Sequence, residues 1–194
     1  MDFSKLLALM FVAMLVNNFL LTRFLGLCPF FGVSKKMDTA VGMSMGVIFV
    51  MVVAGVITWF LNLLLIAWHV EFLQILTFIL VIAALVQLIE LFLKKTNPTL
   101  YSALGIYLPL ITTNCAILGL VLINAGANYT LMETFFNSLG SALGYALALI
   151  LFSSLRGRLD INELPAAFDG MPAAFITAFI LSMSFEAFVG IIKV

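Results

Sequence analysis

Residues 40–61 read AVGMSMGVIFVMVVAGVITWFL, a run of 22 residues without a charged side chain. At 1.5 Å per residue, a helix of this length crosses the roughly 30 Å hydrocarbon core of a bilayer. The whole chain has the same character, because 64% of its 194 residues are hydrophobic and only 9% are charged. Soluble domains carry about 25% charged residues, so this chain lacks the side chains to cover itself in water. The run therefore predicts a membrane-spanning helix.

Five further apolar segments of similar length share the chain with this run. In lipid every backbone N–H and C=O group needs a partner within the protein, a need that helices or closed barrels meet. The segments are continuous and lack the alternation of barrel strands, which favours helices. We therefore predict an all-α integral membrane protein with six transmembrane helices in a single transmembrane domain, residues 1–194. The predicted spans are Phe3–Leu27, Ala40–Leu61, Val70–Leu93, Leu100–Asn124, Leu131–Leu155 and Pro172–Ile192.

The basic residues are distributed unevenly around these spans. The loops after the first, third and fifth spans hold seven of the nine Lys and Arg residues, with Arg23, Lys95 and Arg156 among them. Cytoplasmic loops are enriched in Lys and Arg. The pattern predicts that these three loops face the cytoplasm and that both termini lie outside. The stretch Arg156–Met171 is expected to form the longest loop.

The six spans divide into two halves, residues 1–96 and 97–194. An odd number of spans per half gives the halves opposite orientations, which is the inverted-repeat architecture of many transporters. The first helix of each half carries Asn, Cys and a Leu-Gly-Leu triplet, in a different order, within residues 17–28 and 112–120. The sequence thus favours two inverted three-helix repeats.

The first helix of each half, helix 1 and helix 4 of the six, also contains residues that interrupt helices. Asn17 and Asn18 lie in the middle of the first span, and Pro29 comes after Cys28, just beyond its end. In the fourth span Pro109 removes one backbone hydrogen bond, and residues 112–114 can bind the freed carbonyls. Interrupted helices in corresponding places of two halves point to a functional site. The other reading is that these residues only kink helices and join neighbours.

The two cysteines, Cys28 and Cys115, are separated widely and form no Cys-x-x-Cys motif. Free cysteine often packs as a small buried hydrophobe. A disulfide is not expected, because the charge pattern puts Cys28 toward the reducing cytoplasm. Thiolates also hold iron–sulfur clusters, which typically take four cysteines. Two cannot complete such a site, so a second chain would supply the rest, and the residues alone leave packing and ligation both open.

The residues around both cysteines are similar to one membrane family. Residues 17–30, NNFLLTRFLGLCPF, and residues 104–116, LGIYLPLITTNCA, resemble the A-type subunits of Rnf electron-transport complexes, and the similarity extends over nearly the whole chain. The E-type subunits of the sodium-pumping NADH:quinone reductase look alike in the same regions. The pairs Asn17-Asn18 and Cys28-Pro29 favour the Rnf side.

This resemblance implies a function. Rnf complexes couple electron transfer between reduced ferredoxin and NAD to ion movement across the prokaryotic cytoplasmic (inner) membrane. The resemblance implies that this chain shares an intramembrane [2Fe–2S] cluster with the homologous E-type subunit of the complex, with Cys28 and Cys115 as two of its four ligands. Flavin- and Fe–S-carrying subunits and membrane lipid are the other implied partners, and no nucleic acid is expected.

The chain is expected to act only within such a translocating oxidoreductase and to catalyse nothing alone. Three alternatives stay open: a subunit of the sodium-pumping NADH:quinone reductase, a secondary transporter, and an anchoring membrane subunit.

A shared cluster would require the first helix to be broken. A straight helix from Phe3 would put Cys28 ~35–40 Å along its axis, near the cytoplasmic face, whereas Cys115 lies ~22 Å into its own span. The two sulfurs can meet only if the first span breaks or tilts strongly, and we predict a break between about Asn17 and Cys28. The candidate supporting residues are Asn17, Asn18, Arg23, Thr113 and Asn114.

Two carboxylates lie within predicted spans. Glu90 is four residues before Lys94, an order that favours an ion pair at the membrane interface. Glu186 lies near the outer end of the sixth span. Intramembrane acids often line ion pathways, so both are candidates for the path of the coupled ion. The only histidine, His69, is expected to be a solvated residue of an outer loop.

Overall fold

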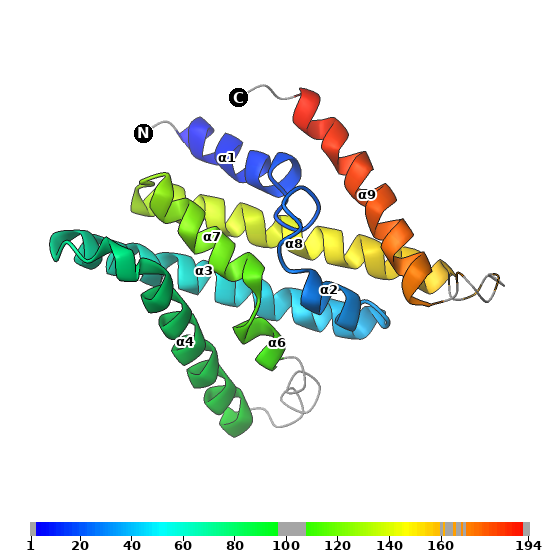
Figure 1. Ribbon diagram of the computed structural model, residues 1–194, viewed down its shortest axis with the longest axis horizontal. Helices are drawn as coiled ribbons and strands as arrows, with labels where there is room; N and C mark the ends of the chain where they lie inside the picture. The colour runs from blue at the N-terminus through cyan, green and yellow to red at the C-terminus, as the bar shows by residue number, and fades with distance from the viewer. Residues whose placement is uncertain are drawn as a thin grey trace.

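The computed structural model describes residues 3–96, 108–159, 161, 165, 168 and 170–191, and within them every regular element is a helix (Figure 1). The all-α prediction is confirmed for this part of the chain. In chain order the elements are α1 (Phe3–Phe11), the π-helix η1 (Val12–Val16), α2 (Leu27–Val33), α3 (Met37–Ala67), the 3-10 helix η2 (Glu71–Leu73), α4 (Gln74–Thr96), α6 (Leu108–Thr112), α7 (Cys115–Gly126), α8 (Leu131–Leu159) and α9 (Met171–Ile191).

Several of these helices have the length and composition of membrane spans. Among the described residues, four qualify: Met37–Ala67, Glu71–Leu91, Pro109–Gly126 and Leu131–Leu159. Two apolar helical segments are shorter, Ser4–Val16 and Met171–Ala187. Each predicted span overlaps one of these six segments, although the first helix ends well before the predicted Leu27.

The two longest helices, α3 and α8, lie side by side and antiparallel in the middle of the molecule (Figure 1). They approach closely at Gly55, where an added Cβ would overlap the Ser138 hydroxyl. Small residues at helix interfaces allow this approach in membranes, where close packing rather than the hydrophobic effect holds helices together. α4 and α9 lie on opposite sides of this central pair (Figure 1).

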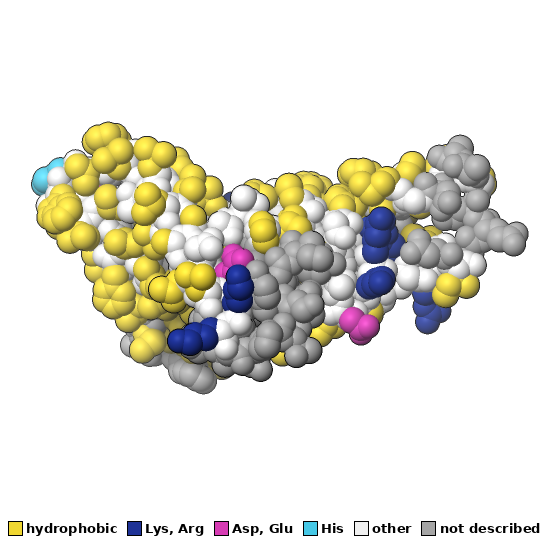
Figure 2. Space-filling model, turned by 90° about the horizontal axis from the view of Figure 1, so that it is seen from below, with side chains coloured by type: hydrophobic (Ala, Val, Ile, Leu, Met, Phe, Trp, Pro, Cys, Tyr) yellow, Lys and Arg dark blue, Asp and Glu magenta, His cyan; other side chains and the backbone are white. Residues whose placement is uncertain are grey.

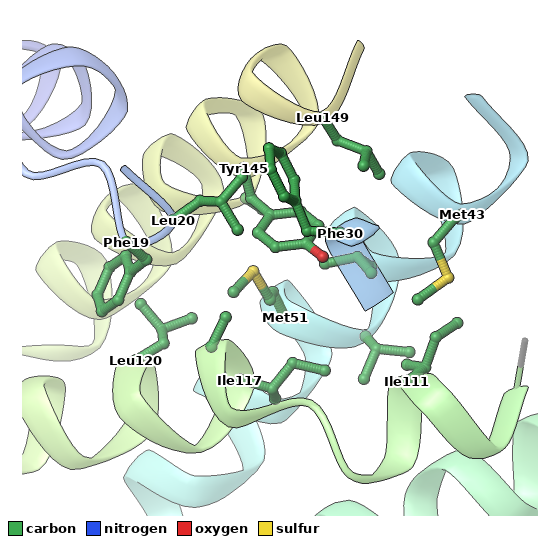
Figure 3. Packing of buried hydrophobic residues seen from close by; sticks show 14 of the residues in the cluster. Phe19, Leu20, Phe30, Met43, Met51, Ile111, Ile117, Leu120, Tyr145 and Leu149 are labelled. Atoms are coloured by element: carbon green, nitrogen blue, oxygen red, sulfur yellow. The ribbon is translucent and has the colours of Figure 1, made fainter. Parts of the chain in front are cut away.

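The buried core lies between the central pair, α7 and the chain that follows η1. Figure 3 shows Tyr145 surrounded by apolar side chains from several elements, Leu20, Phe30 and Met51 among them. The outer surface is also apolar. Figure 2 shows hydrophobic side chains spread over one end of the molecule, where the single histidine, His69, also lies, and basic side chains spread over the middle and toward the other end. Such a surface suits lipid as its solvent.

One predicted boundary is wrong at the end of α8. The predicted span ended at Leu155 and put Arg156 in a loop, whereas the helix continues to Leu159 and Arg156 is buried, with 5% of its surface exposed. The side chain can stay inside because its guanidinium finds acceptors on α2, the Phe31 carbonyl and the Ser34 hydroxyl. A guanidinium with partners does not need to reach water, so it does not end the helix.

Candidate functional site

The helix that begins at Phe3 stops at Val16, and the chain has no regular helix again until Leu27. Its last turn is π-helical, so that the Asn17 N–H donates to the Val12 carbonyl at 2.8 Å. π turns of this kind frequently occur at functional sites. The break predicted between Asn17 and Cys28 is therefore present in the structure.

Asn18 fixes the irregular segment to the rest of the protein. Its side chain is fully buried, and the amide nitrogen donates to the Gly144 carbonyl on α8 at 2.8 Å. The amide oxygen accepts the N–H groups of Leu20 and Leu21 at 3.1 and 3.4 Å, and the Asn18 carbonyl accepts the Thr22 hydroxyl at 2.7 Å. Irregular backbone at membrane depth is tolerated only where the protein supplies such partners.

The approach of α8 to α1 depends on two glycines that we did not predict. A Cβ on Gly140 would overlap the Met10 carbonyl, and one on Gly144 would meet the Met14 carbonyl. Residues 140–144 read GSALG, the small-x-x-x-small motif of close helix contacts in membranes, so the signal is present in the sequence. The close approach brings the Gly144 carbonyl within reach of Asn18.

The second interruption lies between α6 and α7, at Thr113 and Asn114. Asn114 is the N-cap of α7, and its amide oxygen accepts the Ala116 N–H at 3.0 Å. This cap makes Cys115 the first residue of α7, at the end of a helix where negative charge is stabilised. The start of the predicted fourth span, residues 100–107, lies outside the described residues.

The two interruptions meet at Gly26. Its N–H donates to the Cys115 sulfur at 2.9 Å, and its carbonyl accepts the Tyr145 hydroxyl at 3.4 Å. Gly26 has a φ of +87°, and a Cβ there would lie 2.8 Å from the Tyr145 ring and 3.0 Å from the Asn114 amide oxygen. Both the backbone conformation and the space therefore require glycine. Cys28 lies two residues further on, in the first turn of α2.

Cys28 is exposed, Cys115 is partly exposed, and both are free thiols. Over the described residues, no third Cys, His, Asp or Glu joins them in a group that could hold a metal. The chain therefore presents two thiols, and a thiolate-bound metal centre at this place would need further ligands from another chain.

Comparison with known proteins decides the family. The sequence profile of the Rnf-Nqr membrane subunits matches residues 6–192. The chain belongs to the Rnf-Nqr family. It is 52% identical to the A-type subunit of the ion-translocating oxidoreductase complex of Syntrophotalea carbinolica, over 97% of this chain and 98% of the relative. It is 50% identical to the A-type subunit of the Na(+)-translocating ferredoxin:NAD(+) oxidoreductase complex of Acetobacterium woodii, over 95% and 97%. It is 46% identical to the A-type subunit of the ion-translocating oxidoreductase complex of Vibrio vulnificus, over 98% and 100%. The resemblance drawn from the two cysteine segments is confirmed.

In this Rnf-Nqr chain, α8 also fixes the short helix that carries Cys28. The Phe30 ring stacks on Phe152, with 4.1 Å between ring centroids. One turn further along α8, the Arg156 guanidinium donates to the Phe31 carbonyl and to the Ser34 hydroxyl, each at 3.0 Å. These contacts hold both the body and the C-terminal end of α2.

The other predicted site residues of the Rnf-Nqr chain lie further from this centre or face outward. Asn17 and Arg23 are exposed on the irregular segment, and Thr113 is exposed with its hydroxyl donating to the Pro109 carbonyl. Glu90 is partly buried on α4, and Glu186 is exposed on α9. Neither carboxylate forms a metal-binding group with the cysteines among the described residues. Their role in an ion path, like the ion pair of Glu90 with Lys94, stays a prediction.

Proposed function

We propose that this chain is the A-type subunit of an ion-translocating ferredoxin:NAD oxidoreductase complex and that it carries electrons across the membrane through a [2Fe–2S] cluster shared with the homologous E-type subunit. One observation carries the proposal: the Gly26 N–H binds the Cys115 sulfur, and Cys28 lies two residues from Gly26. The reaction comes from the relative of Acetobacterium woodii, which is named as part of a Na(+)-translocating ferredoxin:NAD(+) oxidoreductase complex. The remaining proposed partners are flavin- and Fe–S-carrying subunits.

The residues at the site fit one half of such a cluster. A [2Fe–2S] cluster takes four thiolates, and this chain offers Cys28 and Cys115. The exposure of Cys28 leaves space for ligands from a partner chain. Hydrogen bonds from backbone N–H groups to ligating sulfurs, such as the one from Gly26, orient the ligand and tune the reduction potential.

A bound [2Fe–2S] cluster would act as a one-electron carrier inside the membrane, where water and soluble carriers do not reach. This chain would hold it in position and keep it dry. The Gly26 N–H and the N-terminal end of α7 would stabilise negative charge on Cys115, while the Tyr145 hydroxyl holds the Gly26 carbonyl. Asn18 would keep the irregular segment from moving, because it bonds that segment to α8.

We further propose that the chain crosses the prokaryotic inner membrane six times as two inverted repeats, with both termini outside. The second helices of the halves, α3 and α8, are antiparallel partners, and the third helices, α4 and α9, lie on opposite sides of them (Figure 1). The interrupted first helices of the two halves meet at Gly26 and Cys115. Inverted repeats with broken helices at a central site produce this arrangement.

Electron paramagnetic resonance of the purified intact complex tests the proposal. We expect Cys28→Ser and Cys115→Ser each to remove one [2Fe–2S] signal, and two iron atoms per complex, while every chain of the complex stays assembled. Ser44→Ala on α3 is the control, because it removes a buried hydroxyl that donates to the Ala40 carbonyl of its own helix. An unchanged spectrum in both cysteine variants would contradict the proposal and would indicate that the cysteines only pack against their neighbours.

A further inference from the structure

A pocket of about 290 Å³, lined by apolar and uncharged polar side chains, lies between the C-terminal ends of α3 and α7 and the turn that leads into α8. This end of the bundle lies opposite Lys36, which precedes α3, and opposite Arg156 and Arg158, which lie in the last turn of α8. The polar members of its lining are Thr58, Asn62, Asn124, Asn128, Tyr129 and Thr130. No Asp, Glu, Lys, Arg or His is part of the lining that the structure describes.

We propose that this pocket is the outer binding site of the translocated ion and that it takes a partly dehydrated monovalent cation such as Na⁺. The inference rests on the proposed function, because it assumes that the complex moves an ion.

The oxygen atoms of the pocket suit such a cation. The Thr58 hydroxyl donates its proton to the Ala54 carbonyl at 2.6 Å, so its lone pairs remain able to bind a cation. The Asn62 amide oxygen accepts one hydrogen bond, from Gln74 at 2.9 Å, and keeps a second lone pair. Hard cations prefer oxygen ligands, and neutral oxygens without a carboxylate suit a single charge. The described lining holds no carboxylate and no imidazole, so none of the side chains that commonly exchange protons near neutral pH is present there.

The backbone field at the pocket also favours a cation. Both α3 and α7 end there, and the C-terminal end of a helix is the negative end of its dipole. α8 begins there with its positive end, but the Glu133 carboxylate accepts the N–H and the hydroxyl of Thr130 at 2.9 and 2.8 Å. That carboxylate offsets the positive end of α8, so two negative helix ends remain.

At the floor of the pocket, Asn124 is held by side chains of α8 that lie behind the lining. The Asn137 side chain donates to the Asn124 amide oxygen at 2.6 Å, and the Asn124 side chain donates to the Ser138 hydroxyl at 3.2 Å. All three side chains are more than nine-tenths buried. Coupling-ion sites of transporters use such preset oxygens near helix ends.

A row of buried polar side chains leads inward from this floor. Thr134, Ser138, Ser141 and Tyr145 recur at helical spacing on one face of α8 and are all fully buried. The hydroxyls of Thr134 and Ser141 have no hydrogen-bond partner within the described part of the chain. Buried polar groups without a partner are rare. The row ends at the Tyr145 hydroxyl, which donates to the Gly26 carbonyl.

Cation binding can be measured without electron transfer. In the purified intact complex carrying Ile66→Cys, the new thiol lies in the pocket lining on α3. A neutral hydrophilic maleimide labels it, and mass spectrometry of this chain reads the rate in NaCl against choline chloride of equal ionic strength. We expect Na⁺ to slow labelling saturably. The neighbouring Ala67→Cys variant, outside the lining, is expected to label at the same rate in both salts.

Adding Thr58→Val to the Ile66→Cys complex tests the assignment to this pocket. We expect the half-effective Na⁺ concentration to rise about tenfold, as for other losses of one group around a bound metal ion. The matched control is Thr177→Val, since the Thr177 hydroxyl makes the same bond to a carbonyl four residues back, on α9. Equal labelling in both salts, or a Na⁺ effect that Thr58→Val leaves unchanged, would overturn the inference.

The outcome is separable from that of the proposed function. Labelling needs no cluster and no electron flow, whereas the proposed function is judged by the resonance signal of the cysteine variants. A complex that loses no cluster signal in those variants but shows the Na⁺ effect at Ile66→Cys would keep this inference as a cation site. A complex that loses the cluster signal in the cysteine variants but shows no Na⁺ effect at Ile66→Cys would support the proposed function and overturn this inference.

Discussion

Asn18 and Gly26 carry most of the break in the first helix, and each does so for a different reason. Asn18 acts through its side chain, which satisfies backbone groups that the broken helix leaves free. Gly26 acts through the absence of a side chain, because its φ of +87° and its contact with Tyr145 exclude a Cβ. Each effect depends on one residue, so a single substitution can test it.

Asn18→Ala should destabilise the irregular segment strongly. The change removes the acceptor of the Leu20 and Leu21 N–H groups and the bond to the Gly144 carbonyl, and a buried unsatisfied N–H costs about 1–3 kcal/mol. We expect a lower midpoint of thermal unfolding for the detergent-solubilised complex. Asn17→Ala, at the exposed neighbour, should leave the midpoint nearly unchanged. Equal midpoints for the two variants would show that Asn18 does not hold this segment.

Gly26→Ala should disturb the surroundings of Cys115 more than the fold. The left-handed conformation costs alanine about 1–2 kcal/mol, and the new methyl group would press on the Tyr145 ring. We expect the Gly26 N–H to move away from the Cys115 sulfur and the proposed [2Fe–2S] signal to shift or disappear. Gly32→Ala is the control, because no heavy atom lies within 4 Å of an added Cβ there. The same spectrum in both variants would argue against Gly26 as a support of the site.

At the scale of elements, the sequence predicted helices far better than the contacts between them. Local signals announced the breaks, because the Asn17-Asn18 pair and residues 112–114 interrupt apolar runs. Contacts between distant elements have no local signal. Nothing around Tyr145 indicates that its hydroxyl meets Gly26, 119 residues earlier. Arg156 was predicted as a loop residue because charge is the usual mark of a span's end, and its acceptors on α2 lie more than 120 residues away.

Arg156→Gln should loosen α2. The variant loses the charge-assisted bonds to the Phe31 carbonyl and the Ser34 hydroxyl, and bonds to charged groups contribute about 1.5–3 kcal/mol each. Because α2 carries Cys28, we expect changed g-values of the proposed cluster and a lower iron content of the complex. Arg158→Gln, on the same last turn but exposed, should change neither. If the Arg156→Gln and Arg158→Gln complexes gave identical spectra, the contacts of Arg156 with α2 would not support the cluster site.

At the scale of the whole molecule, four basic residues and the pocket lie at opposite ends of the bundle. Lys35 and Lys36 lie before α3 and Arg156 and Arg158 end α8, while the pocket lies where α3 and α7 finish. The positive-inside rule predicts that the end with these basic residues faces the cytoplasm. The molecule therefore offers a direct test of which end faces the cytoplasm.

Surface labelling of whole cells checks the orientation. We expect a cysteine at Lys36, next to α3, to react with an impermeant thiol reagent only after the inner membrane is opened. A cysteine at Ala127, in the exposed turn between α7 and α8, should react while that membrane is intact. Both are exposed positions at opposite ends of the bundle, so each controls for the other. The reverse pattern would place the termini in the cytoplasm and the pocket on the inner side.

The hydrogen bond between Asn18 and the Gly144 carbonyl joins residues 126 positions apart, and this separation is also an interval of time during synthesis. Ribosomes add about 5–20 residues per second, so the Asn18 side chain waits roughly 6–25 seconds for its partner to be made. The apolar helical segment before it, Ser4–Val16, is too short to cross the bilayer as a straight helix. This segment therefore reaches its final position only after α8 has entered the membrane, so it is made before α8 but settles after it.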